Sequence, residues 1–167
     1  MTPRNARQAD LAAIVAIYNS TVASREVTAD LEPVTVASRG RWFDEHDPAS
    51  RPLWVIEDEA GQQILGWLSF SNFYGRPAYR HTAEISIYLA PEARGRGLGT
   101  FLLARAIEHA PQIQVRTLLG FIFGHNRASL ALFKRHGFEN WAHLPAVAEL
   151  EGVERDLVIL GRRILPA

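Results

Sequence analysis

Hydrophobic positions along the chain recur with two periods, and these periods predict alternating helices and strands. The 3.6-residue period predicts four helices, and a two-residue period or a short apolar run predicts seven strands. The helices are expected at residues 11–18, 36–45, 98–110 and 128–136, and the strands at 3–6, 53–57, 64–70, 84–89, 118–123, 146–150 and 157–160. This order indicates a mixed α/β (α+β) fold with a mostly antiparallel sheet and helices on both of its faces.

Caps and turns divide the pattern at plausible places. Asp10 is expected to cap the first helix, Gly61 to turn a hairpin, and Gly137 to end the fourth helix in a left-handed conformation. A turn near Gly152 joins the last two strands. Apart from its helix, the segment 22–47 shows no strand pattern, which is typical of a loop-rich region over a binding site.

The strand 84–89 carries the first candidate for chemistry. Alternation places its three aliphatic residues on one face and Glu84, Ser86 and Tyr88 on the other. A carboxylate in a site could take the proton from an amine, whose pKa lies near 10, before the amine attacks an acyl group. An isolated strand glutamate more commonly faces water, so the neighbouring sequence has to decide between the two interpretations.

Directly after this strand, three glycines at alternate positions and two arginines open an apolar helix pattern, over the residues Arg94, Gly95, Arg96, Gly97, Leu98 and Gly99. Such a run predicts a backbone loop that holds phosphate oxygens. A dinucleotide loop would require Gly or Ala at the position of Thr100, and the loop of nucleotide triphosphatases requires a Gly-Lys pair, which the chain lacks. An ordinary glycine-rich turn with solvated arginines is the remaining alternative.

Composition fits one small-molecule enzyme domain over residues 1–167. The chain is 47% hydrophobic, and its 18 basic and 18 acidic residues cancel, so we expect neither nucleic acid nor membrane as a partner. The absence of cysteine excludes disulfides and a covalent acyl-cysteine intermediate. No leader pattern or long apolar run is present, so a cytoplasmic protein is expected.

Two motifs resemble known families. The run 94–99 matches [Q/R]-x-x-G-x-[G/A] and resembles the acyl-CoA loop of the GCN5-related N-acetyltransferases (GNAT). The segment Arg76-Pro77-Ala78-Tyr79, followed by Thr82 and Glu84, resembles phosphinothricin and methionine sulfoximine N-acetyltransferases within that superfamily. Matches of this grade cover roughly residues 70–138 and include Asn126 and the pair Gly137-Phe138.

The resemblance implies a GNAT fold of about seven strands and four helices, acetyl-CoA as co-substrate, no metal, and a homodimer. It implies that Glu84 is the general base and that Arg76 and Tyr79 line the acceptor pocket with it. The backbone of Ile87, Tyr88 and Leu89 would pair with the pantetheine arm. The pyrophosphate would bind the loop residues Arg94, Gly95, Arg96, Gly97, Leu98, Gly99 and Thr100. Asn126 would also contact the cofactor, with a plain helix N-cap as the alternative.

Two departures from the family pattern limit the assignment. Phe133 stands where many relatives have a tyrosine or histidine that protonates the departing thiolate, so that acid is unassigned. His125 and His136 lie near this position in sequence, although surface or capping roles are commoner for a histidine. The tail is less similar, and its Trp141 and His143 are candidates for pocket walls or for ordinary packing.

The sequence therefore predicts an N-acetyltransferase that acts on a small amino-acid-like amine of the phosphinothricin, methionine sulfoximine or methionine sulfone type. Direct attack in a ternary complex is expected, because no cysteine is present for a covalent relay. Two alternatives stay open: an acetyltransferase for another amine, including a peptide or protein N-terminus, and an acyl-CoA-binding sensor without turnover.

Overall fold

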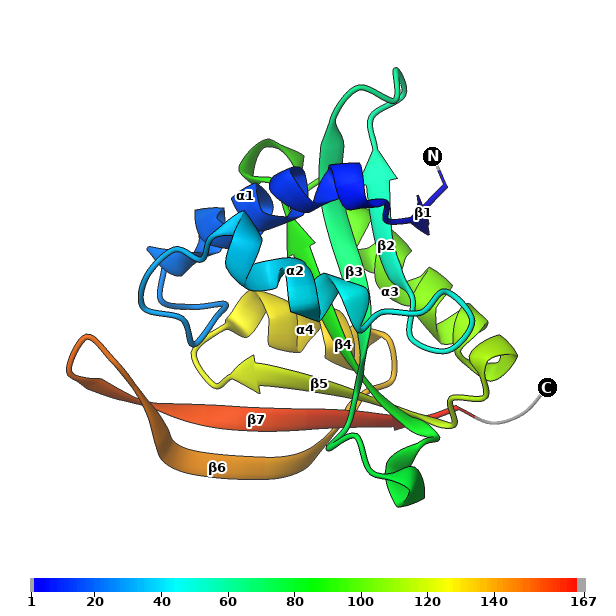
Figure 1. Ribbon diagram of the computed structural model, residues 1–167. Coiled ribbons are helices and arrows are strands. Elements are labelled where there is room, and N and C mark those ends of the chain that lie inside the picture. Colours follow the sequence, from blue (N-terminus) through cyan, green and yellow to red (C-terminus); the bar gives the residue numbers. More distant parts are fainter. Residues whose placement is uncertain (1, 165–167) are drawn as a thin grey trace.

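The computed structural model describes residues 2–164 and contains one sheet of seven strands in the order β1-β2-β3-β4-β5-β7-β6 (Figure 1). The strands are β1 (Arg4–Asn5), β2 (Leu53–Glu57), β3 (Ile64–Asn72), β4 (Thr82–Leu89), β5 (Thr117–Phe123), β6 (Glu139–Leu150) and β7 (Val153–Arg163). The helices are α1 (Leu11–Val22), α2 (Val36–Asp44), α3 (Leu98–His109) and α4 (Arg127–Arg135). Neighbouring strands are antiparallel except β4 and β5, which confirms the predicted mixed fold.

The helices cover both faces of the sheet, as the pattern predicts (Figure 1). Helix α1 packs on β3 and β4, where the Trp67 indole N–H donates to the carbonyl of Ile14 at 3.1 Å. On the opposite face of the sheet, Phe70 packs beside Trp54 and beside His109 at the end of α3. Odd- and even-numbered positions of β3, here Trp67 and Phe70, therefore pack against opposite layers, as strand alternation requires.

The start of α1 differs from the expectation. Asp10 stands at the predicted N-cap position, but its side chain makes no capping hydrogen bond, and a 3-10 turn at Gln8–Asp10 precedes the helix. The Asp10 carboxylate points back to accept the backbone N–H of Arg7 at 2.6 Å and pairs with Arg4 at 2.8 Å. These two contacts use the oxygens that a cap would need for the N–H groups of the following turn.

Strands β4 and β5 pair only at their beginnings, over Thr82–Glu84 and Thr117–Leu119. Beyond this point β4 keeps its pairing with β3, and its other edge is open. The N–H of Ala90 donates to the Leu65 carbonyl on the β3 side at 2.9 Å. By alternation, the N–H and C=O groups of Ile87 and Leu89 face the open side.

The C-terminal hairpin is longer than the pattern predicts, since β6 and β7 extend over Glu139–Leu150 and Val153–Arg163. The outer half of β6 is an exposed edge with register shifts and a proline, so its residues lack the alternation that marks a half-buried strand. The predicted turns at Gly61 and Gly152 lie between β2 and β3 and between β6 and β7. Within residues 2–164, no helix has the length and apolar character needed to cross a membrane.

Candidate active site

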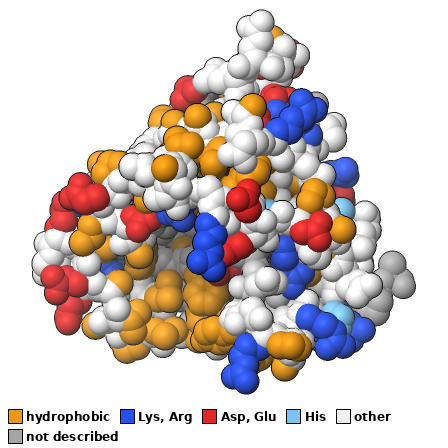
Figure 2. Space-filling model, in the orientation of Figure 1, with side chains coloured by type: hydrophobic (Ala, Val, Ile, Leu, Met, Phe, Trp, Pro, Cys, Tyr) orange, Lys and Arg blue, Asp and Glu red, His pale blue; other side chains and the backbone are white. Residues whose placement is uncertain are grey.

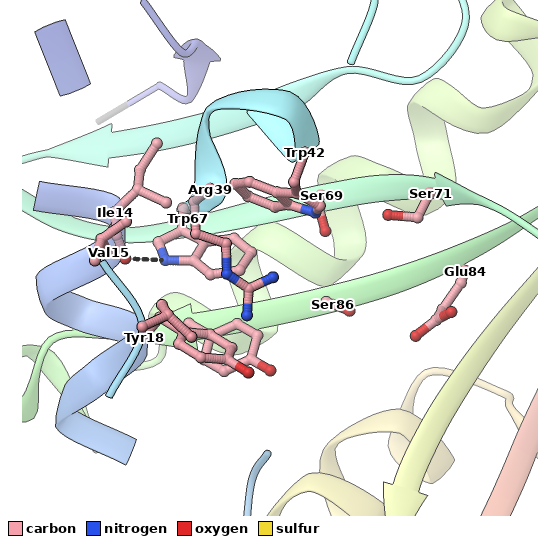
Figure 3. A pocket seen from close by; sticks show the side chains of 12 residues that line it. Ile14, Val15, Tyr18, Arg39, Trp42, Trp67, Ser69, Ser71, Glu84 and Ser86 are labelled. Atoms are coloured by element: carbon pink, nitrogen blue, oxygen red, sulfur yellow. Dashed lines mark hydrogen bonds between the residues drawn. The ribbon is translucent and has the colours of Figure 1, made fainter. Parts of the chain in front are cut away.

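A cavity of about 210 Å³ lies between the sheet and helices α1 and α2, and we call it the Glu84 cavity (Figure 3). Odd-numbered residues of β3 and even-numbered residues of β4 form its floor, which confirms the predicted orientation of Glu84, Ser86 and Tyr88. The lining residues are Ile14, Val15, Tyr18, Val34, Arg39, Trp42, Trp67, Ser69, Ser71, Glu84, Ser86 and Tyr88. On the face shown in Figure 2 the surface is hollowed between α2 and the strands β5 and β7.

Glu84 is the one acidic side chain among these lining residues. It is partly buried, and burial raises the pKa of its carboxyl group above the ordinary value. No hydrogen-bond donor among residues 2–164 contacts the carboxylate, so its oxygens are available to a ligand or to water. A carboxylate of this kind can accept a proton from a bound amine.

Four aromatic rings in contact form one wall of the cavity. The Trp42 and Trp67 ring centroids are 5.6 Å apart, Trp67 stacks on Tyr88 at 4.4 Å, and Tyr88 lies 5.1 Å from Tyr18. The guanidinium of Arg39 lies 4.6 Å from the Tyr18 ring centroid and points into the cavity (Figure 3). Neither Arg39 nor Trp42 was predicted, although both belong to the predicted helix 36–45, one helical turn apart.

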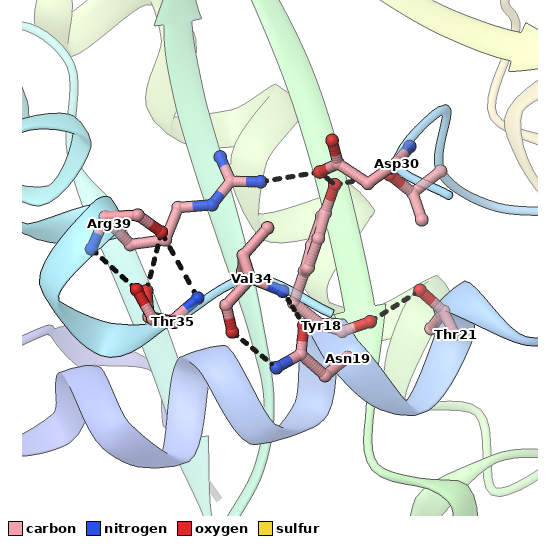
Figure 4. Close-up of polar contacts among 9 residues, drawn as sticks. Tyr18, Asn19, Thr21, Asp30, Val34, Thr35 and Arg39 are labelled. Carbon is pink, nitrogen blue, oxygen red and sulfur yellow. Dashed lines mark hydrogen bonds and ion pairs between the residues drawn. The ribbon is translucent and has the colours of Figure 1, made fainter. Parts of the chain in front are cut away.

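Polar contacts hold the segment between α1 and α2 against the cavity (Figure 4). The Tyr18 hydroxyl is hydrogen-bonded to Thr28 and to the carboxylate of Asp30. The Asn19 amide donates to the Val34 carbonyl at 2.8 Å and accepts from the Val34 N–H at 2.9 Å. The loop-rich segment is therefore fixed over the cavity through side chains of α1.

A second hollow of about 580 Å³, the glycine-loop groove, runs along the open edge of β4 to the start of α3. Gly95 and Gly97 have φ angles of 72° and 79°, in the left-handed region that glycine adopts without strain. Gly97 is the N-cap of α3, so the first N–H groups of that helix, with its positive dipole end, border the groove. This arrangement suits an anionic ligand such as a phosphate.

Most of the residues predicted to bind acetyl-CoA border this groove. Its lining includes Ile87, Tyr88, Leu89, Arg94, Gly95, Gly97, Leu98, Gly99, Thr100, Asn126 and Phe133. Arg96 is exposed between the two left-handed glycines and is absent from the lining. The Asn126 side chain accepts the Ser129 N–H at 3.1 Å, so its N-cap role is confirmed, and its contact with a cofactor stays a prediction.

Tyr88 lines both the Glu84 cavity and the glycine-loop groove. The two hollows therefore adjoin at this residue, on the strand that carries Glu84. Burial raises the pKa of the Tyr88 hydroxyl. A ligand in the groove and a second ligand in the cavity could meet at this point.

Arg76 and Tyr79 lie outside both hollows, on the exposed connection between β3 and β4. The Tyr79 ring packs against Phe73 at a centroid distance of 5.3 Å, and Phe73 lies 6.4 Å from Phe121 of β5. The short 3-10 turn at Pro77–Tyr79 belongs to this connection. The structure does not bring these two residues to Glu84 within the chain, and their role stays a prediction.

Phe133 and the two histidines near it in sequence, His125 and His136, each pack or form hydrogen bonds within the fold. Phe133 is buried, with its ring over Gly120 and 4.9 Å from Phe138. The His125 Nε2 is hydrogen-bonded to the Arg25 carbonyl at 2.7 Å, and His136 Nδ1 to that of Leu132 at 2.9 Å. Neither histidine lines the groove or the cavity.

The tail candidates are also placed away from Glu84. Trp141 covers Gly161 of β7, where a Cβ atom would lie 2.1 Å from the indole ring. His143 pairs with Asp156 at 2.7 Å across the β6–β7 ladder. Neither residue lines the Glu84 cavity, and a pocket-wall role for either stays a prediction.

Comparison with known proteins shows the family of the chain. The family model of the acetyltransferase (GNAT) family matches residues 14–138. YwnH of Bacillus subtilis, a proposed phosphinothricin acetyltransferase, is 54% identical over 98% of this chain and 99% of its own length. The L-methionine sulfoximine/L-methionine sulfone acetyltransferase of Pseudomonas paraeruginosa is 34% identical over 98% of this chain and 94% of its own length.

The structural comparison agrees. The crystal structure of a GNAT superfamily phosphinothricin acetyltransferase from Sinorhizobium meliloti, in complex with acetyl-CoA, superimposes with a TM-score of 0.91. It is 32% identical and covers 98% of this chain and 88% of its own. The chain therefore belongs to the acetyltransferase (GNAT) family and is an acetyl-CoA-dependent N-acetyltransferase.

Proposed function

We propose that this enzyme acetylates the primary amine of a small amino-acid-like acceptor, of the phosphinothricin, methionine sulfoximine or methionine sulfone type, in a ternary complex with Glu84 as general base. The observation that carries the proposal is the meeting of the two hollows at Tyr88, with the carboxylate on the cavity side. The printed activities of its relatives support the acceptor class. A homodimer in the cytoplasm completes the proposal.

On the donor side, acetyl-CoA occupies the glycine-loop groove. Its pyrophosphate is held by the backbone amides from Gly95 to Thr100 and by nearby arginines. Its pantetheine arm carries amides and adds as a strand along the open edge of β4, toward which the backbone groups of Ile87 and Leu89 point. An amide on this strand donates to the thioester oxygen as negative charge develops there.

On the acceptor side, Glu84 takes a proton from the substrate ammonium directly or through one water. The freed lone pair attacks the thioester carbonyl carbon, a C–N bond forms, and the C–S bond breaks with its electron pair leaving on sulfur. The second amine proton passes to solvent, and the coenzyme A thiolate takes a proton from water. The raised pKa of Glu84 favours the first step, because it brings the base closer to the pKa of the amine.

The test is thiol release from acetyl-CoA against a panel of amino acids, methionine sulfone, methionine sulfoximine, phosphinothricin and a peptide with a free N-terminus. With the best acceptor, Glu84→Gln should lower kcat/KM by roughly 10²–10⁴-fold, the usual worth of a general base. The Kd for acetyl-CoA should stay unchanged, since Glu84 lies outside the groove. Glu59→Gln, on an exposed turn, is the matched control.

Three results would contradict the proposal in different ways. Unchanged kcat/KM and pH profile in Glu84→Gln would remove Glu84 as base. Turnover with the peptide alone would indicate that the enzyme acts on peptide or protein N-termini. Acetyl-CoA binding without release above background for any amine would favour a sensor.

A further inference from the structure

We propose that Arg39 recognises the carboxylate of the acceptor and so selects amino acids over other amines, an inference that rests on the function proposed above. Arg39 projects from α2 into the Glu84 cavity (Figure 3). It is the one cationic side chain among the lining residues, as Glu84 is the one anionic side chain. A bound amino acid zwitterion would complement both charges at once.

The guanidinium of Arg39 is already held in place. Its Cζ lies 4.6 Å from the ring centroid of Tyr18 and 5.9 Å from that of Trp42. Its Nη2 donates to the carboxylate of Asp30 at 2.9 Å. A planar guanidinium fixed on an aromatic face loses little further freedom when it binds an anion.

Two nitrogens of this guanidinium remain for a ligand. Among residues 2–164, no hydrogen-bond acceptor contacts the Nη1 or Nε atom of Arg39. The Arg39 side chain is 26% exposed, so these N–H groups are within reach of a molecule in the cavity. Nη2 carries a second N–H besides the one directed at Asp30, so a carboxylate can bind side by side to Nη2 and one of these two nitrogens. Charge-assisted hydrogen bonds of this kind are about twice as strong as neutral ones.

The remaining lining limits the side chain of the acceptor. The walls offer aromatic rings and the hydroxyl groups of Ser69, Ser71 and Ser86, without a further charged group. A charged acceptor side chain would therefore lose water without meeting a counter-charge. Among the proposed acceptors, the uncharged sulfone and sulfoximine side chains match these walls, and the anionic phosphinate of phosphinothricin should make it the poorer substrate.

Arg76 provides the sharpest comparison, because family resemblance gives the acceptor-binding role to that residue. Its side chain is exposed on the β3–β4 connection and lies outside the lining of the cavity. If the acceptor carboxylate is bound within one chain, Arg39 is the arginine in position for it. The two arginines therefore make opposite predictions for one experiment.

The experiment compares L-methionine sulfone with its carboxamide as acceptors for wild type, Arg39→Gln, Asp30→Asn and Arg76→Gln. Arg39→Gln should raise KM for the free acid by roughly tenfold or more while changing KM for the amide little. Asp30→Asn removes the ion pair and leaves the guanidinium, so the preference for the acid should persist. Arg76→Gln should also retain it.

Each other result overturns the assignment. Equal losses for acid and amide in Arg39→Gln, matched by Asp30→Asn, would show that Arg39 only supports the loop. Loss of acid preference in Arg76→Gln alone would transfer the role to Arg76. Calorimetric binding of the acid and the amide in the presence of coenzyme A provides a readout without turnover, so a failure of the catalytic proposal remains distinguishable from a failure of this one.

Discussion

The two halves of the candidate site are built in different ways. The part of the glycine-loop groove that suits a phosphate is formed by two neighbouring stretches, the end of β4 and the loop that follows it, and residues from 21–27 and 126–135 complete its lining. The Glu84 cavity is made of side chains from α1, α2, β3 and β4, which are far apart in sequence. A ligand in the groove would meet amides that any sequence with suitable glycines provides, whereas a ligand in the cavity would meet this chain's particular residues.

This difference has a functional meaning. A common co-substrate can be bound by a conserved backbone shape, since phosphate and amide groups are recognised by N–H and C=O groups. The identity of an acceptor has to be recognised by side chains, because these carry the charge and shape that distinguish amines. The acceptor half is therefore where we expect members of this family to differ.

The largest effect that sharpens the comparison is expected from Gly97→Ala. A Cβ atom at this position has no neighbour within 4 Å, so the substitution adds backbone strain at φ 79° without a clash. A non-glycine residue in this conformation costs about 1–2 kcal/mol, which favours a relaxed loop and should weaken acetyl-CoA binding by roughly tenfold. Equilibrium binding of acetyl-CoA measures this change.

Gly61→Ala is the matched control for this prediction. Gly61 has a φ of 66° and equally open surroundings, and it lies on the β2–β3 turn outside the groove. Both variants should lose similar stability, and Gly97→Ala alone should lose acetyl-CoA affinity. Equal affinities in the two variants would mean that the left-handed glycine geometry has no part in holding the donor.

The same contrast explains what could be predicted from the sequence. The glycine loop, the alternation of β4 and the N-cap at Asn126 are local patterns, and the structure places them as predicted. Arg39 and Trp42 belong to a predicted helix, but their contacts with Tyr18 and Trp67 depend on how α2 docks over the sheet. Such tertiary contacts have no periodic signal in the sequence.

The errors follow the same rule. Asp10 makes no side-chain capping hydrogen bond, because the Arg4 guanidinium, six residues earlier, and the backbone N–H of Arg7 bind its carboxylate instead. The outer half of β6 was missed because it is an exposed edge strand. Arg76 and Tyr79 are a different case: they were carried over from a family motif, they lie outside the lining of the cavity within this chain, and their role stays a prediction.

The partly buried carboxylate of Glu84 in the acceptor half should lower the free energy of unfolding at neutral pH, and the second prediction measures this loss. Burial raises the folded pKa of Glu84 above its unfolded value. Between those two values the folded state holds more protons, so the free energy of unfolding falls as pH rises through this window. At pH 8, Glu84→Gln should therefore melt higher than wild type, by about 2 °C for a chain of this size.

The sign of this effect distinguishes it from ordinary surface changes. Below the unfolded pKa of a glutamate, about 4.3, the carboxyl is neutral in both states and the difference in Tm should vanish. Glu59→Gln, at an exposed position, should show no such dependence on pH. A lower Tm for Glu84→Gln at pH 8 would mean that the carboxylate stabilises the fold, contrary to its burial.

The smallest effect is expected from Phe133→Tyr, which asks whether the donor half needs a side-chain acid after all. Phe133 lines the groove, and its ring lies over Gly120. A thiol with a pKa of about 8.5 leaves readily as a thiolate, so an added hydroxyl should change kcat by less than about threefold between pH 7 and 9. Phe133→His tests the same position with a different acid, and Tm values report whether both variants fold. A rise in kcat of roughly tenfold in either folded variant would show that thiolate protonation limits turnover. The donor half would then depend on a particular side chain, and the contrast with the acceptor half would fail at this residue.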